Sequence, residues 1–295
     1  MLVSIPFLLI TTIELRSRQF KFTTLGRLKY SEGYKYADIW YFFINIFIAR
    51  FQQITIFTTL GLSLFTEEVG ETLHNLYEKI FPQYDWIYSS TLIFIILILS
   101  KDLMQYMAHR LSHNFGLLWD LHEFHHSAKE LTILSQQRGF AIAGVFDSFI
   151  FLPFAVLISS ALPESITNGN FITLGLYVFD LVMTDFFGYF GHSSSKLIYP
   201  KPFNQIYMSP ALHWLHHSRD ERHWQCNFGE KYPFWDKLFG TYLDETHLNE
   251  VTHYGVYGGS EYNKFHPLYS YTIVPILKIF RRTNLMNLFR SHLNY

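Results

Sequence analysis

The chain contains a single cysteine, Cys226, among its 295 residues. One cysteine excludes an intrachain disulfide and also a thiolate cage for a metal ion. Charged residues are scarce as well, at 16% of the sequence, whereas they form about a quarter of a typical soluble domain. The formal net charge of -1 provides no global basic field, so we expect no nucleic-acid partner.

Apolar residues are correspondingly abundant. Hydrophobic residues make up 49% of the chain, with 30 Phe and 20 Tyr. Runs long enough to enter or cross a bilayer lie at 2–15, 39–65, 86–100, 145–162 and 171–191. The run at 2–15 is marginal, and Arg50 interrupts the run at 39–65, which is either one tilted span or two interfacial helices. The pattern predicts an all-α fold of polytopic integral membrane helices.

Charge between the apolar runs orients the chain. Segment 16–35 is rich in lysine and arginine, whereas segment 67–85 is mainly acidic. The positive-inside rule places segment 16–35 in the cytoplasm. Counting spans from there returns the chain to the cytoplasm after residue 100, and the helical hairpin of 145–162 and 171–191 brings it back again. The sequence therefore predicts a multi-pass protein whose polar segments after 100 and after 191 are both cytoplasmic.

Histidine is the most informative residue in this chain. Eight of its 15 histidines fall in three clusters, His109-x3-His113, His122-x2-His125-His126 and His213-x2-His216-His217. A spacing of three or four residues puts imidazoles on one face of a helix, and histidine is the commonest metal ligand. One such pair is often accidental, but three clusters together indicate a site for more than one ion. Clustered imidazoles suit iron, zinc, copper or nickel rather than magnesium or calcium.

The clusters and their surroundings resemble the fatty acid hydroxylase and sterol desaturase superfamily of membrane oxygenases. The resemblance covers residues 102–242 and rests on His109-Arg110-Leu-Ser-His113, Leu118-Trp119-Asp-Leu-His122-Glu-Phe-His125-His126-Ser127, Ser209-Pro210-Ala-Leu-His213-Trp-Leu-His216-His217, Asn227-Phe228-Gly229 and Trp235-Asp236-Lys-Leu-Phe239-Gly240-Thr241. His192, within Gly191-His192-Ser193, also lines up with a ligand position of the family. One departure is that Gln225 precedes Cys226 where an acidic residue is frequent.

The resemblance implies two Fe ions, with Zn as a replacement, and O2 as co-substrate. The implied metal ligands are His109, His113, His122, His125, His126, His192, His213, His216 and His217. It also implies hydroxylation, or else desaturation, of a C–H bond of a lipid such as a sterol or a fatty acyl chain. Leu268 follows His266-Pro267, so the His-Pro-Gly-Gly motif of a haem-binding cytochrome b5 domain is absent. Electrons are then expected from a separate donor of the reductase, cytochrome b5 or ferredoxin type.

Other polar residues are expected to support the site or to stand apart from it. The candidates for holding ligands in place are Asp102, Asp120, Glu123, Asp185 and Asp236. A structural ion pair is the expected role of Arg138, and a structural or solvated role that of His223. The histidines outside the pattern are His74, His247, His253, His266 and His292.

We predict one membrane-embedded domain over residues 1–295, with a catalytic core at 102–242 and a C-terminal cap at 243–295. In the cap, segment 272–280 is either an interfacial helix or an ordinary packed helix. Two other functions stay open, a membrane metal transporter and a non-catalytic lipid-binding relative. A transporter predicts ionisable residues inside the spans, and Arg50, Asp180 and Asp185 are among the few present there.

Overall fold

The computed structural model of the protein describes residues 4–17, 19–30, 38–44, 86–139, 171–256 and 267–282, with the single residues 47, 71, 72, 75, 79 and 262. Its named elements are α1 (Ser4–Ser17), η1 (Phe20–Phe22), α2 (Thr24–Tyr30), α5 (Trp86–Asn114), α6 (Gly116–His126), η2 (Ile133–Gln137), α8 (Phe171–Gly191), α9 (Phe203–Ile206), α10 (Pro210–His216), η3 (Glu221–His223), α11 (Phe234–Phe239), η4 (Glu245–Glu250) and α13 (Pro267–Arg282), where η marks a short 3-10 helix. These residues form no β-strand, only an isolated bridge between Ser218 and Tyr254. The predicted all-α fold is confirmed for this part of the chain.

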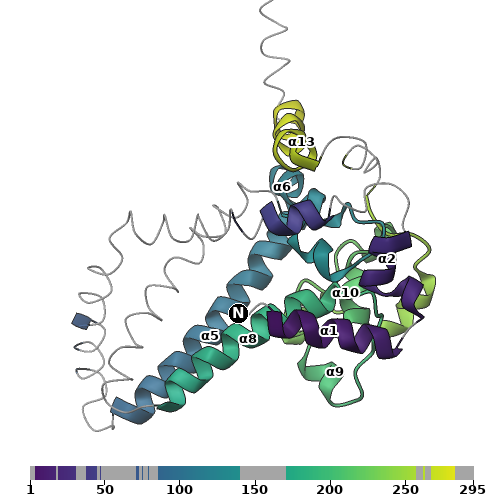
Figure 1. The fold of residues 1–295 in the computed structure, drawn as a ribbon. Helices are drawn as coiled ribbons and strands as arrows, with labels where there is room; N and C mark the ends of the chain where they lie inside the picture. The colour runs from purple at the N-terminus through teal and green to yellow at the C-terminus, as the bar shows by residue number, and fades with distance from the viewer. Residues whose placement is uncertain are drawn as a thin grey trace, which may run out of the picture.

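Two long helices, α5 and α8, run side by side (Figure 1). The apolar run at 86–100 continues without a break to Asn114, so the first histidine cluster lies near the end of the same helix, as predicted. The run at 171–191 coincides with α8. Between the two helices, the carboxylate of Asp180 accepts hydrogen bonds from Lys101 Nζ at 2.5 Å and from Lys231 Nζ at 2.6 Å. This ion cluster holds both helices to the loop that carries Lys231.

The N-terminal helix α1 packs against α8 rather than standing alone. Ile10 belongs to a buried cluster with Tyr189 and Phe190 of α8. The carboxylate of Glu14 is fully buried and accepts hydrogen bonds from the backbone N–H groups of Thr24 at 2.7 Å and Ser194 at 2.6 Å. Because a buried carboxylate is stable only when its oxygens are paired, these contacts fix α1 beside the segment that follows α8.

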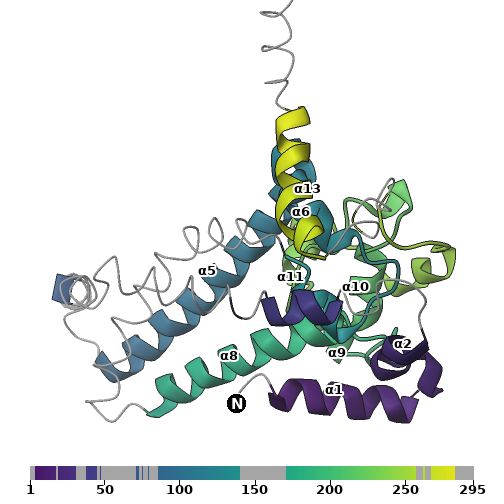
Figure 2. The same cartoon turned by 45° about the horizontal axis from the view of Figure 1, so that its top comes forward.

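The C-terminal helix α13 lies along α6, the helix of the second histidine cluster (Figure 2). Glu123 of α6 accepts hydrogen bonds from Lys278 Nζ and, at 3.1 Å, from the Tyr262 hydroxyl. The opposite side of α13 exposes an apolar ridge at helical spacing, made of Tyr269, Ile273, Leu277 and Phe280. The predicted helix at 272–280 is therefore present. One side of it packs against α6, and no described residue covers the other side.

The membrane part of the prediction is not shown by these helices. Among the described residues, no helix combines the length and the apolarity that a membrane crossing requires. The apolar run at 145–162 and most of the run at 39–65 lie outside the described residues. The predicted spans and the division into a core and a cap therefore stay predictions.

Candidate metal centre

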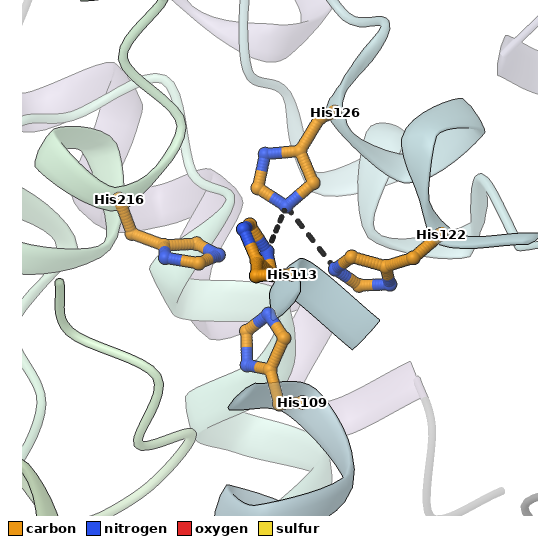
Figure 3. A group of neighbouring side chains, drawn as sticks. All are labelled: His109, His113, His122, His126 and His216. Carbon is orange, nitrogen blue, oxygen red and sulfur yellow. Dashed lines mark hydrogen bonds between the residues drawn. The ribbon is translucent and has the colours of Figure 1, made fainter. Parts of the chain in front are cut away.

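The fold brings all nine predicted histidines together in two adjoining groups. The first group comprises His109, His113, His122, His126 and His216, and the second comprises His125, His192, His213 and His217. Figure 3 shows the rings of the first group converging on one point from α5, α6 and α10. The two groups adjoin, since the rings of His126 and His217 stack with centroids 4.2 Å apart.

The H-x2-H-H spacing explains how one short helix serves two groups. Residues four apart share a helix face, whereas consecutive residues point about 100° apart. On α6, His122 and His126 therefore join the first group, and His125 joins the second. The third cluster reverses this pattern, because His213 and His217 belong to the second group while His216 joins the first. The second and third clusters thus contribute to both groups, whereas His109 and His113 of the first cluster both join the first group.

The distances between ring nitrogens fit a shared metal ion. In the first group, Nε2 of His126 lies 3.1 Å from Nε2 of both His113 and His122 (Figure 3). In the second group, His125 and His192 approach to 3.2 Å, and His213 and His217 to 3.1 Å, again through Nε2 atoms. Two nitrogens bound at about 2.0–2.1 Å to the same ion lie roughly 3 Å apart. Each group can therefore hold one metal ion.

Burial keeps these imidazoles neutral. It lowers the pKa of His109 to about 4 and that of His125 to about 3. Burial, followed by repulsion from neighbouring imidazoles, holds the pKa of the other seven well below the usual value for histidine. A metal ion binds neutral imidazole, so at pH 7 no proton has to leave before binding.

Two carbonyls of one loop orient histidines of the first group. The loop 224–228 presents the backbone oxygens of Cys226 and Phe228 to His216 and His109, respectively. The Nδ1–H groups of His216 and His109 each donate at 2.8 Å, which leaves Nε2 of both rings facing the site. Among the described residues, neither Nε2 atom has a hydrogen-bond partner. A metal ion would satisfy these buried acceptors, and such outer hydrogen bonds fix ligand orientation in metal sites.

Asp236 connects the Asn-Phe-Gly motif at 227–229 to the Trp-Asp-x-x-Phe-Gly-Thr motif at 235–241 through hydrogen bonds. Its buried carboxylate accepts from the backbone N–H of Phe228 at 2.7 Å, from that of Gly229 at 2.8 Å and from Thr241 Oγ1 at 2.7 Å. Burial raises the pKa of Asp236 to about 6, although these hydrogen bonds oppose the rise. Asn227, at a φ of 54°, turns the loop and bonds across to Leu243. One motif therefore anchors the loop that orients the ligands.

The second group is oriented by other elements. Nδ1–H of His192 faces the Ser135 hydroxyl of η2 at 3.2 Å. The side chain of Arg138 pairs with Asp38 at 2.6 Å and donates to the Ser127 hydroxyl at 3.0 Å. Arg138 thus makes the structural ion pair that the sequence predicts.

The remaining candidates contact the site less directly. Asp102 accepts from Trp235 Nε1 at 2.8 Å and lies 3.6 Å from Lys231 Nζ. Asp120 and Glu123 are buried in α6, and Glu123 binds Lys278 of α13 rather than a histidine of the site. The side chain of Asp185 lies outside the described residues. Sequence reasoning missed the carbonyl of Cys226, because a backbone contact leaves no residue type to recognise.

A third set of possible ligands lies apart from the two groups. His223, His247 and Glu250 have ligand atoms within 4.8 Å of one another. However, Glu250 already accepts from Arg222 Nη1 at 2.8 Å and faces His247 Nδ1 at 2.9 Å, while His223 Nδ1 lies 3.0 Å from the Ser218 hydroxyl. Because the Arg222 guanidinium already neutralises the Glu250 carboxylate, we assign these residues a structural role, in which polar contacts link η3 to η4.

These features define a protein with a histidine-rich centre whose two groups could each hold a metal ion. The family model for fatty acid hydroxylase matches residues 94–241, half of the 295-residue chain. The chain therefore belongs to the fatty acid hydroxylase family, as its sequence motifs indicate. All nine histidines of the two groups lie inside the matched segment.

Curated relatives carry names of lipid oxygenases. Ornithine lipid hydroxylase OlsE of Rhizobium tropici is 31% identical over 137 residues, which cover 46% of this chain and 38% of that protein. Human alkylglycerol monooxygenase is 28% identical over 159 residues, covering 54% of this chain and 32% of the relative. Fatty acid hydroxylase vlmA of Lecanicillium sp is 28% identical over 164 residues, covering 51% and 41%. The chain thus matches well under half the length of these relatives. No solved structure matches it.

Proposed function

We propose that this protein is an O2-dependent oxygenase that hydroxylates a C–H bond of a lipid at a centre of two iron ions. The observation that carries the proposal is the arrangement of nine neutral imidazoles, five buried and four half-buried, in two adjoining groups. Membership of the fatty acid hydroxylase family and the names of the relatives support a lipid as the substrate. Desaturation differs from hydroxylation only in the fate of the second hydrogen, and the relatives' names favour hydroxylation.

In this proposal, the first group holds one iron ion and the second group holds the other. Bound iron would supply the oxidising power that an unactivated C–H bond requires. The residues of the chain hold the ions, orient the imidazoles through the loop 224–228 and Ser135, and keep bulk water away by burial. Electrons come from a separate protein donor, since the single cysteine excludes a cysteine-ligated cluster within the described chain.

We also propose that the protein is embedded in a membrane. Exposed apolar side chains cover the long helices, with Ile95, Ile96 and Leu99 on α5 and Val178 and Phe179 on α8. The apolar runs at 39–65 and 145–162 and the ridge on α13 add to this surface. A lipid could then keep its apolar body in the bilayer while its reacting end reaches the histidines at the end of α5.

The metal content tests the centre directly. Protein purified gently from membranes and loaded with iron should contain about two equivalents of metal, one for each group. Zinc in place of iron would agree with the proposal, because imidazole sites exchange borderline metals during overexpression. A stoichiometry near zero after iron loading, measured by elemental analysis, would contradict it.

Sidedness tests the proposed membrane topology. A reporter fused after Tyr242 should behave as cytoplasmic, and one inserted near Glu71 should behave as external, because basic residues gather at 16–35 and acidic ones at 67–85. Finding both reporters on one side would show that segment 39–65 does not span. That result would not contradict the proposed metal centre or the proposed lipid substrate.

The activity itself is tested by lipid conversion. Membranes that contain the protein, supplied with an electron donor and isotopically labelled O2, should yield a lipid that carries one labelled oxygen atom. The matched control is the His192→Ala variant, which lacks one member of the second group. A labelled lipid formed equally by both proteins would exclude this centre as the source of the product.

A further inference from the structure

Two cavities of the described structure that touch the candidate metal centre differ in what they reach. The smaller cavity, about 230 Å³, is lined by His109 and His122 of the first group and by His125 and His213 of the second. The larger cavity, about 410 Å³, meets the first group only, through His113, His126 and His216. A substrate atom that must approach both ions therefore belongs in the smaller cavity. Its volume is below that of a site for a whole drug-sized molecule, so only the reacting end of a lipid fits.

Part of the wall of this cavity is polar besides the histidines. It contains the side chains of Gln105, Gln136 and Glu230. Gln105 Nε2 donates to Glu230 Oε2 at 3.3 Å, while Gln105 Oε1 is buried and, among the described residues, has no hydrogen-bond partner. A Cβ atom placed on Gly188 would lie 2.9 Å from Gln136 Nε2 and 3.2 Å from Glu230 Oε1. The absence of a side chain at Gly188 thus leaves room for these two polar groups.

The same elements that hold the ligands also hold the polar wall. Gln105 lies one turn before His109 on α5, and Gln136 follows Ser135, the partner of His192, in η2. Glu230 comes two residues after Phe228, whose carbonyl orients His109. These positions are tied to the elements of the centre, and their side chains line the same cavity as histidines of both groups.

A lipid chain without polar groups would match this wall poorly. A buried oxygen without a donor costs free energy, and so does a carboxylate placed against hydrocarbon. The wall offers carbonyl and carboxylate oxygens, which are hydrogen-bond acceptors. We propose that Glu230 and Gln105 form a subsite that binds a hydrogen-bond donor of the substrate, a hydroxyl or an ammonium group, close to the carbon that is oxidised. This inference rests on the proposed function and places the reaction at the headgroup end of the lipid.

The test compares two lipids that differ only in their hydrogen-bond donor groups. An alkylglycerol carries free hydroxyl groups, whereas its dimethyl ether has the same chain and no donor. The iron-loaded wild-type protein should convert the alkylglycerol with a higher kcat/KM than the ether. Glu230→Leu should reduce the ratio of the two kcat/KM values by about tenfold, the equivalent of roughly 1.4 kcal/mol, mainly through KM. Equal conversion of both lipids by the wild type, or an unchanged ratio in the variant, would overturn the subsite.

Two further variants distinguish a hydroxyl from an ammonium as the bound hydrogen-bond donor and provide an alternative if Glu230→Leu does not fold. Glu230→Gln should retain the preference for an alkylglycerol over its dimethyl ether, because the amide oxygen still accepts a hydrogen bond. If the natural hydrogen-bond donor is an ammonium group, this variant should bind an ornithine lipid more weakly, since only the carboxylate carries charge. Gln105→Met removes the unpaired oxygen at similar volume and should reduce the same ratio if Glu230→Leu does not fold. The control is Glu221→Gln at an exposed position of η3, which should leave the ratio unchanged.

A binding measurement keeps the subsite distinct from the proposed activity. Thermal stabilisation of the oxygen-free, iron-loaded protein by each lipid reports binding without turnover. If no lipid is converted but the alkylglycerol stabilises the protein more than its ether does, the subsite stands and the proposed activity fails. If lipids are converted but the two stabilise equally, the activity stands and the subsite is wrong.

Discussion

Replacing His192 with alanine is expected to abolish lipid turnover and to release one of the two metal ions. His192 is fully buried, and its Nε2 lies 3.2 Å from that of His125 in the second group. Loss of an outer-sphere partner alone typically costs about 10- to 100-fold in metal affinity, and the loss of a ligand should cost more. We therefore expect metal analysis to give roughly one equivalent instead of two, with the first group still loaded.

The matched control is His253→Ala, because His253 is an exposed histidine outside both groups. Surface substitutions usually change stability by less than about 0.5 kcal/mol, so this variant should keep its metal and its turnover. If His192→Ala retained two metal ions and full activity, the second group would not be a metal site. A thermal melt of both variants separates loss of metal from loss of the fold.

Replacing Asp236 with asparagine is expected to weaken metal binding although Asp236 touches no ligand. Its carboxylate accepts three hydrogen bonds, two of them from the backbone of Phe228 and Gly229. An asparagine amide would turn one acceptor into a donor and leave a buried N–H unpaired, which costs about 1–3 kcal/mol. The loop 224–228 would then lose its anchor, and we expect metal affinity to fall by about 10- to 100-fold.

Asp244→Asn provides the control for this second prediction. Asp244 is exposed and caps η4 by accepting from the Thr246 backbone N–H at 2.9 Å, a role that asparagine also fills. Competition with a chelator measures the affinity of each variant, and the unfolding of the metal-free proteins shows whether Asp236→Asn acts on the fold alone. Equal metal affinity in the two variants would show that the anchor does not position the ligands.

The sequence predicted much of this site because short-range spacing carries the information. Each histidine cluster lies on one helix or at its end, so the periodicity of a helix already brings its imidazoles together. The continuation of the apolar run at 86–100 into His109 and His113, and the helix at 171–191, were predicted from local pattern in the same way. His192 was different, because only the family resemblance pointed to it.

The sequence by itself determined the three histidine clusters and the helices that carry them, since both depend on neighbours three or four residues apart. Only the tertiary structure decided how the histidines divide, with consecutive residues such as His216 and His217 in different groups. It also decided that the carbonyls of Cys226 and Phe228 orient two rings, and that Gln105 meets Glu230 at 3.3 Å. Gln105 and Glu230 are separated by 125 positions along the chain, and carbonyls are common to every residue. Packing between distant segments, rather than any local pattern, therefore sets these contacts.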